Sequence, residues 1–407
     1  MTASAKGAVG GARRAAPGTP SARQFPAVLS HGFRPFFLLG AFYAGLIILA
    51  WLPLLHGLIE LASAFSPLDW HVHETMFGFV AAIVGGFLLT AIPNWTGRLP
   101  VRGLPLLALV LLWLAGRVAV LVSGEIGWVA AAIVDCLFLA ALAAAAAKEI
   151  VAGRNWRNLK MLAPVTLFFL ANVLFHVEAG LSGTSFYGGR LAIATVLVLI
   201  MIVGGRIIPS FTRNWLARES PGRLPAPFGR FDGVTIALST VALLLWTVVP
   251  DSTVSGNALV AAAALNLVRL ARWAGDRTGP DVLVLILHVA YLFLPTGFLL
   301  AGLAALAPAH VPAIAAVHAF GVGTMGTMTL AVMTRATLGH TGRALKADLW
   351  TSLIYLAIVL AAVLRIVAGF IPDVTWILYL SATCWMLAFF GYGIRYGGML
   401  LRLARAS

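Results

Sequence analysis

Histidine is the residue type in this chain with the clearest potential for chemistry. The chain has nine histidines, and four of them are expected at one depth, in the outer third of the bilayer: His71, His73, His176 and His318. An ionisable side chain is costly to bury in a bilayer, so each one found there is a functional candidate. Neutral imidazole is a good ligand for haem iron and for copper. The sequence therefore predicts a haem or metal site that uses these side chains.

The spacing of His71 and His73 limits how the two can be used. Residues two apart point about 200° apart around a helix, so both cannot face one site. One is expected to face the bundle interior, and the other solvent, a second site or the helix entrance. We favour His73 and His318 as iron ligands, with His176 as a third candidate for iron or copper. The alternative for each histidine is a packing role in which its ring forms hydrogen bonds. Several buried imidazoles would then all need hydrogen-bond partners inside the bundle.

A second group of candidate residues is basic and lies at the opposite ends of the apolar segments. Arg206 and Arg335 are close to their segment ends, deeper than surface anchoring requires, and could bind haem propionates or another anion. His31, which is added by position, and His340 lie on this same side and are further candidate metal ligands. The alternative for all four is anchoring at the membrane surface.

A glycine motif near His318 resembles a dinucleotide-binding loop. Residues 321–326 read G-x-G-x-x-G, but no strand precedes them and they lie inside an apolar segment. The nucleotide interpretation needs a strand, a turn and then a helix, so it fails. Close helix packing is the better interpretation, and the same small residues would admit a flat cofactor beside His318.

The elements that must position these residues are membrane-spanning helices. The chain is 61% hydrophobic and 10% charged, whereas a soluble domain carries about 25% charged residues. Its apolar blocks are long enough to cross roughly 30 Å of hydrocarbon as helices. We predict an all-α bundle of about twelve spans. The expected bounds are 36–56, 71–93, 104–122, 127–147, 160–180, 190–210, 233–250, 256–273, 281–304, 311–334, 350–369 and 375–398.

The distribution of positive charge predicts the orientation of the bundle. Of the 28 basic residues, 25 lie in alternate loops and the termini, and only Arg117, Arg190 and Arg365 lie elsewhere. Cytoplasmic loops collect lysine and arginine, so both termini are expected in the cytoplasm and the number of spans is even. This distribution also explains the net charge of +14 without nucleic acid. Residues 1–24 are expected to be a disordered cytoplasmic tail, and 25–407 a single transmembrane domain.

Short sequence similarities recur at the predicted cytoplasmic ends of the second, sixth and tenth spans. The segment 92–96, IPNWT, resembles 208–212, IPSFT, and 333–335, MTR, ends the tenth span. These similarities are typical of a four-helix unit present three times, although such short helix ends also recur by chance.

Several segments together resemble the NnrS family of bacterial membrane proteins. Their order from residue 32 to residue 343 is kept, so the resemblance covers most of the chain. The segments are GFRPFF at 32–37, WHVHE at 70–74 with GF at 78–79, LLTAIPNWTGR at 88–98, GRIIP at 205–209, FT at 211–212, and the run from His318 through MTR at 333–335 to LGHTGR at 338–343.

The resemblance implies a twelve-span protein of the bacterial inner membrane that contains haem b and copper. It also implies a link to denitrification and to nitric oxide resistance. It assigns no ligands, although His71, His73, His318 and His340 fall within matching segments. The chain departs from the haem-copper oxidases because it has no adjacent histidine pair, so their mechanism is not carried over.

Two functions from different classes follow. The first is a haem- and copper-binding protein that binds or turns over nitric oxide or its iron adducts, with the bilayer and a small uncharged ligand as its partners. The sequence identifies no electron donor. The second is a secondary transporter of a small solute or metal, in which Arg117, Asp135, Glu178 and Arg365 would mark a polar pathway.

Overall fold

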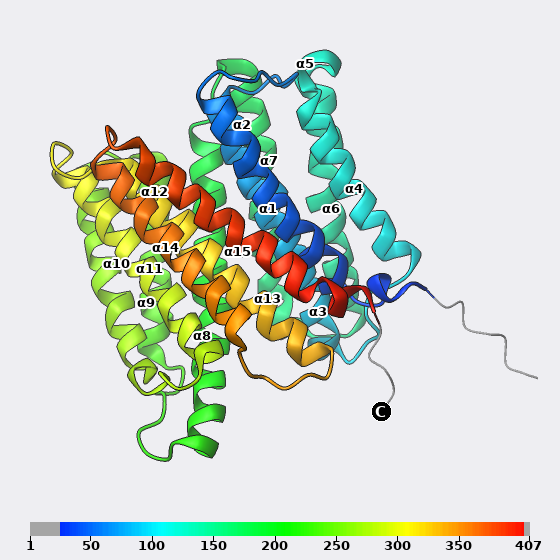
Figure 1. Ribbon diagram of the computed structural model, residues 1–407, viewed down its shortest axis with the longest axis vertical. Coiled ribbons are helices and arrows are strands. Elements are labelled where there is room, and N and C mark those ends of the chain that lie inside the picture. Colours follow the sequence, from blue (N-terminus) through cyan, green and yellow to red (C-terminus); the bar gives the residue numbers. More distant parts are fainter. Residues whose placement is uncertain (1–24, 403–407) are drawn as a thin grey trace, which may run out of the picture.

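The computed structural model describes residues 25–402 as a bundle of helices, without a strand in that range (Figure 1). Twelve spans are long and apolar enough to cross a membrane, as predicted. Ten are single helices. These are α1 (Phe33–Leu55), α4 (Leu104–Leu121), α6 (Trp128–Ala152), α7 (Leu162–Ser182), α8 (Tyr187–Glu219), α9 (Arg230–Val248), α10 (Thr253–Ala271), α11 (Val282–Leu306), α14 (Leu349–Phe370) and α15 (Thr375–Leu401).

The second and tenth spans are each built from three helical segments. The second consists of α2 (Pro67–His73), the π-helical η2 (Glu74–Val80) and α3 (Ala81–Thr96). The tenth consists of α12 (Ala313–His318), the π-helical η5 (Ala319–Gly326) and α13 (Thr327–His340). In both spans the π-helical turn begins immediately after a histidine. Such turns are rare and are often found at functional sites.

The two ends of the described chain lie at the same face of the bundle. Arg34, in the first turn of α1, donates hydrogen bonds to the carbonyl oxygens of Met399, Leu400 and Arg402 at 2.8–3.1 Å. An even number of spans follows directly. We call this side of the bundle the terminal face. The expected disordered tail, residues 1–24, lies outside the described residues.

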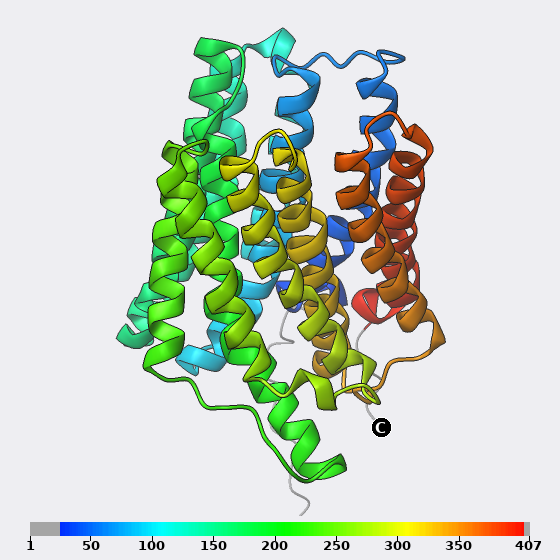
Figure 2. The same ribbon diagram turned by 90° about the vertical axis from the view of Figure 1, so that its left-hand side faces the viewer.

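Helix α8 extends further than the sequence predicts. It continues through Pro209 to Glu219, and its end projects beyond the other helices at the terminal face (Figures 1 and 2). The continuation remains packed because Thr212 and Leu216 are buried. The Thr212 hydroxyl also lies 2.8 Å from Nε2 of His288, a buried histidine of α11, which gives this histidine a packing role.

The packing of the spans repeats with a period of four. In each group of four, the first span packs against the second, and the third against the fourth: α4 with α6, α9 with α10, and α14 with α15. The fourth span then packs against the first span of the next group, and α15 closes the ring on α1. The second span of each group is the innermost, together with α11. The three second spans, which we call the inner spans, carry the similar segments found in the sequence.

Candidate functional site

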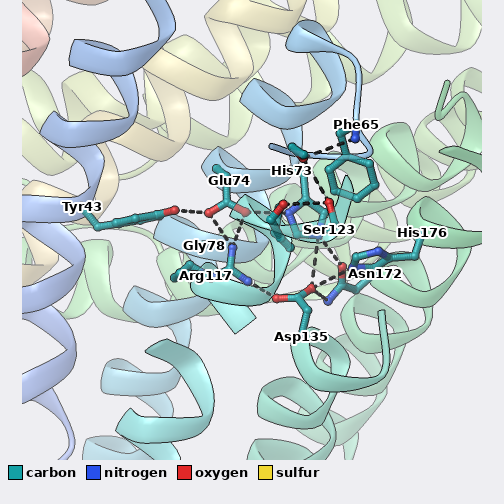
Figure 3. Close-up of polar contacts among 12 residues, drawn as sticks. Tyr43, Phe65, His73, Glu74, Gly78, Arg117, Ser123, Asp135, Asn172 and His176 are labelled. Carbon is teal, nitrogen blue, oxygen red and sulfur yellow. Dashed lines mark hydrogen bonds and ion pairs between the residues drawn. The ribbon is translucent and has the colours of Figure 1, made fainter. Parts of the chain in front are cut away.

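A buried polar cluster lies between α2, η2, α4, α6 and α7 (Figure 3). It lies towards the face opposite the terminal face. It contains His73 from the end of α2, Glu74 from the start of η2, Arg117 from α4 and Asp135 from α6, all at most 8% exposed. Each of these groups would be costly to bury alone in an apolar bundle. Their contacts with one another therefore decide whether the site is stable.

Arg117 holds the two carboxylates of the cluster together. Its Nη1 donates to both oxygens of Glu74 at 2.7 and 2.8 Å, and its Nη2 donates to Asp135. Glu74 also accepts a hydrogen bond from the hydroxyl of Tyr43. Gly78 permits this approach, because a Cβ there would lie 2.7 Å from the Tyr43 ring and 2.9 Å from Arg117 Nη1.

Three ligand atoms converge beside this ion pair. Oδ2 of Asp135 lies 3.2 Å from Nε2 of His73 and 3.1 Å from Nε2 of His176. One atom from each of these three side chains lies within 4.8 Å of the others. Oδ1 of Asn172 lies 3.1 Å from the same nitrogen of His73. Two imidazoles and a carboxylate at this spacing are suited to a transition-metal ion.

The cluster carries an unbalanced charge. Arg117 and Asn172 donate hydrogen bonds to the oxygens of Glu74 and Asp135, as expected if both carboxylates are ionised. The single charge of Arg117 offsets only one of these two negative charges. Nδ1 of His73 lies 2.9 Å from Glu74, so a neutral imidazole that donates there turns its Nε2 lone pair towards the oxygens of Asp135 and Asn172. The arrangement needs one positive charge at this point, either a proton on His73 or a bound metal ion.

The cluster is shielded from the opposite face by Phe65. This residue lies in the connection between α1 and α2, and its ring centroid is 4.9 Å from that of His73 and 5.2 Å from that of His176. The two imidazole centroids are themselves 4.9 Å apart. An aromatic cover of this kind keeps water away from the ligand atoms and so strengthens their electrostatic interactions.

A second site lies on another side of the same helix. His71 and His318 line one cavity of about 140 Å³ between α1, α2, α12 and α15. Nδ1 of His71 is buried with no hydrogen-bond partner. Nδ1 of His318 lies 2.8 Å from the carbonyl oxygen of Ile314, which leaves its Nε2 for a ligand. Arg365 lines the same cavity and forms no ion pair within residues 25–402.

Two neighbours define the space around these imidazoles. The ring of Trp51 is stacked on His71, with centroids 4.4 Å apart and planes 15° from parallel. Gly321, one turn beyond His318, lines the cavity, and a Cβ built there would meet nothing within 4 Å. A cavity of this volume holds a benzene-sized molecule. A larger planar ligand requires Trp51 to move off the His71 ring.

The structure thus groups the four histidines in two pairs. His71 and His73 face different sites, as their separation around the helix requires. His73 lies with His176, whereas His318 lies with His71, so the favoured combination of His73 and His318 is not brought together. The predicted spans put all four histidines at a similar depth in the membrane, but depth does not tell which helices are neighbours.

The predicted basic candidates lie elsewhere. Arg206, Arg335 and His340 line a cavity of about 870 Å³ at the terminal face. Arg335 is seventeen residues beyond His318, about 25 Å along the helix axis, so it belongs to a different site from the histidine. The ring of Phe33 lies 6.0 Å from His31 and 5.3 Å from His340. Burial and the nearby Arg34 lower the pKa of His31.

The polar residues of the transporter interpretation do not line one path. Arg117 and Asp135 bind each other, and Arg365 lies beside the His71 cavity. The carboxylate of Glu178 accepts hydrogen bonds from the backbone N–H groups of residues 186–188, so it provides partners for the first N–H groups of α8.

The two cysteines, Cys136 and Cys384, are unpaired.

Sequence reasoning missed two members of the buried cluster, Asn172 and Tyr43. Asn172 precedes His176 by four residues and therefore shares its helix face, which is a usable signal. Its Nδ2 donates to Asp135 at 2.8 Å. Tyr43 gives no such signal, because only the packing of α1 against η2 brings it to Glu74.

Comparison with known proteins gives one result. A family model described as NnrS protein matches residues 27–403, which is nearly the whole chain. No curated protein matches the chain.

Proposed function

This chain belongs to the NnrS family, and on that basis we propose that it is a haem- and copper-binding protein of the bacterial inner membrane that acts on nitric oxide. The family supplies the expectation of haem, copper and nitric oxide. One observation in this chain carries the proposal: two pairs of histidines form two separate sites on different sides of one helix, with His73 and His176 buried and His71 and His318 half-buried. A protein with two different metal groups needs two such sites.

In this proposal His71 and His318 hold the haem. Both imidazoles have a ring nitrogen without a protein partner, and both border the same cavity. Arg365 supplies an unpaired positive charge for a carboxylate of the porphyrin. Haem iron held by histidine supplies a site for electron transfer or, with an open position, for a small gas. Haem is larger than this cavity, so the proposal requires Trp51 to move off the His71 ring. The apolar side chain of Phe79 lines the same cavity and excludes water.

His73, Asp135 and His176 hold the copper in this proposal. Imidazole and carboxylate groups suit copper, and the metal ion would supply the positive charge that the cluster lacks. Glu74 orients the His73 ring through Nδ1, and Arg117 in turn holds Glu74. Such supporting contacts fix which ring nitrogen is available to a metal. The donor set and its spacing therefore fit the group.

Filling the space beside His318 tests the haem site. The variant Gly321→Phe is expected to lower the haem content of the purified protein severalfold, because its ring would occupy the cavity that Gly321 leaves open. The control is Gly321→Ala, whose added methyl meets no neighbour within 4 Å and should leave the haem content unchanged. Haem is measured as the pyridine adduct. Equal haem in the two variants would contradict this location.

The proposed activity is tested by exposing the purified protein to nitric oxide. Protein reduced without oxygen is expected to show a changed haem absorption spectrum when nitric oxide is added, and no change with nitrogen gas. A haem spectrum that nitric oxide leaves unaltered, in both the oxidised and the reduced protein, would contradict the proposed role. A transporter that contains no haem would show no haem absorption spectrum.

A further inference from the structure

A large cavity lies at the terminal face of the described chain, away from both histidine pairs. Its volume is about 870 Å³, and it is bordered by the ends of the three inner spans. The segments that resemble one another in sequence contribute Trp95, Phe211 and Arg335 to its wall. The repeated four-helix units therefore enclose a shared space at this face. The cavity is not used in the proposed function.

The wall of this cavity is positively charged. Arg206, Arg218, Arg335 and His340 line it, and none of its lining residues is acidic. Within residues 25–402, Arg206 and Arg335 form no ion pair, whereas Arg117 and Arg269 deeper in the bundle each bind an aspartate. Cations that line a cavity without a protein counter-ion attract an anionic ligand.

Aromatic side chains lie beside these charges. The guanidinium carbon of Arg335 lies 4.0 Å from the ring centroid of Phe211, and Phe37, Phe87 and Trp95 line the same space. The stacked guanidinium of Arg335 keeps its N–H groups available at its edge. A ligand here would meet charge and an apolar surface together.

A second, apolar cavity adjoins this one towards the middle of the bundle. It has a volume of about 80 Å³ and shares Phe87, Val203 and Val332 with the larger cavity. None of its lining residues is charged, and it reaches Val80 and Met325 in the two π-helical segments. The combined space thus has a charged end at the terminal face and an apolar end between the inner spans.

We propose that this combined cavity binds an anionic amphiphile. Its carboxylate or phosphate groups would bind Arg206 and Arg335, and its apolar body would lie against Phe87 and Phe211. Two sources have this chemistry, an anionic phospholipid and a porphyrin-like dicarboxylate. The proposal does not depend on haem at His71 and His318 or on copper at the other pair.

The test uses the full chain in neutral detergent and one arm for each source. The first arm measures retention of phosphatidylglycerol and of phosphatidylcholine by native mass spectrometry. The second titrates metal-free mesoporphyrin IX and its uncharged dimethyl ester. In at least one arm the anionic compound should bind the wild-type protein about tenfold more tightly than the neutral one, because it adds a charge-assisted hydrogen bond.

Matched variants locate the binding. The double variant R206Q/R335Q should lose the preference for the anionic compound, whereas R230Q, which removes an exposed arginine away from the cavity, should keep it. The variant H318A should also keep it. The proposal is overturned if anionic and neutral compounds bind alike in both arms, if R206Q/R335Q keeps the preference, or if H318A alone abolishes it.

Discussion

Replacing His318 by alanine is expected to remove the haem from the purified protein, and replacing His71 by alanine is expected to do the same. Both imidazoles border one cavity, and each has a ring nitrogen with no protein partner. Loss of either would remove one of the two histidines that would hold the haem, and no other described histidine lies in the wall of the cavity. The measurement is the Soret absorbance per protein, together with the pyridine adduct.

The control for this prediction is His288→Ala. His288 is also buried in the bundle, but it contacts Thr212 and lines neither the His71 cavity nor the polar cluster. Its variant should retain the wild-type spectrum, apart from any loss of protein yield. If H71A and H318A keep a wild-type Soret band per folded protein, these residues do not hold haem.

Replacing Arg117 by alanine is expected to lower the free energy of unfolding by about 3–5 kcal/mol. The change leaves two carboxylates, those of Glu74 and Asp135, buried without their cation, which is more costly than losing the attraction itself. The measurement is unfolding by denaturant in mixed micelles, with a chelator present so that metal loss does not contribute.

The matched control for Arg117 is Arg223→Ala. Arg223 binds Asp276 at 2.5 Å, but both side chains are more than half exposed. Solvent screens such a pair, so its loss should cost less than about 1 kcal/mol. A second variant, R117A/E74Q/D135N, should recover part of the stability because it removes the uncompensated charges. Similar losses for R117A and R223A would show that the buried cluster is not an ionised network.

The number of spans could be predicted from the sequence because it depends on local composition. Apolar blocks of sufficient length fix the helices, and alternate basic loops predict an even count. The predicted end of α8 was wrong because tertiary packing extends the helix. Pro209 and the arginines after it are typical of a helix end, yet Thr212 and Leu216 are buried and continue the packing. The π-helical turns after His73 and His318 carried no recognisable sequence pattern.

The candidate site was predictable in its residue types but not in its pairing. Helical geometry alone separates His71 from His73. The partner of each depends on the neighbouring helix, and α7 brings His176 to His73 while α12 brings His318 to the cavity of His71. Asp135 and Arg117 were recognised as costly charges in the membrane. Their binding to each other, and to Glu74, follows only from the packing of α4, α6 and η2.

The most direct test of two separate centres is the haem and copper content of three proteins prepared in parallel. The wild-type protein is expected to contain both groups. The variant H318A should lose haem and keep copper, and H176A should lose copper and keep haem. Haem is measured as the pyridine adduct and copper by elemental analysis, each per folded protein. Loss of both groups in both folded variants, or of neither group in either, would contradict the assignment of two histidine pairs to two sites.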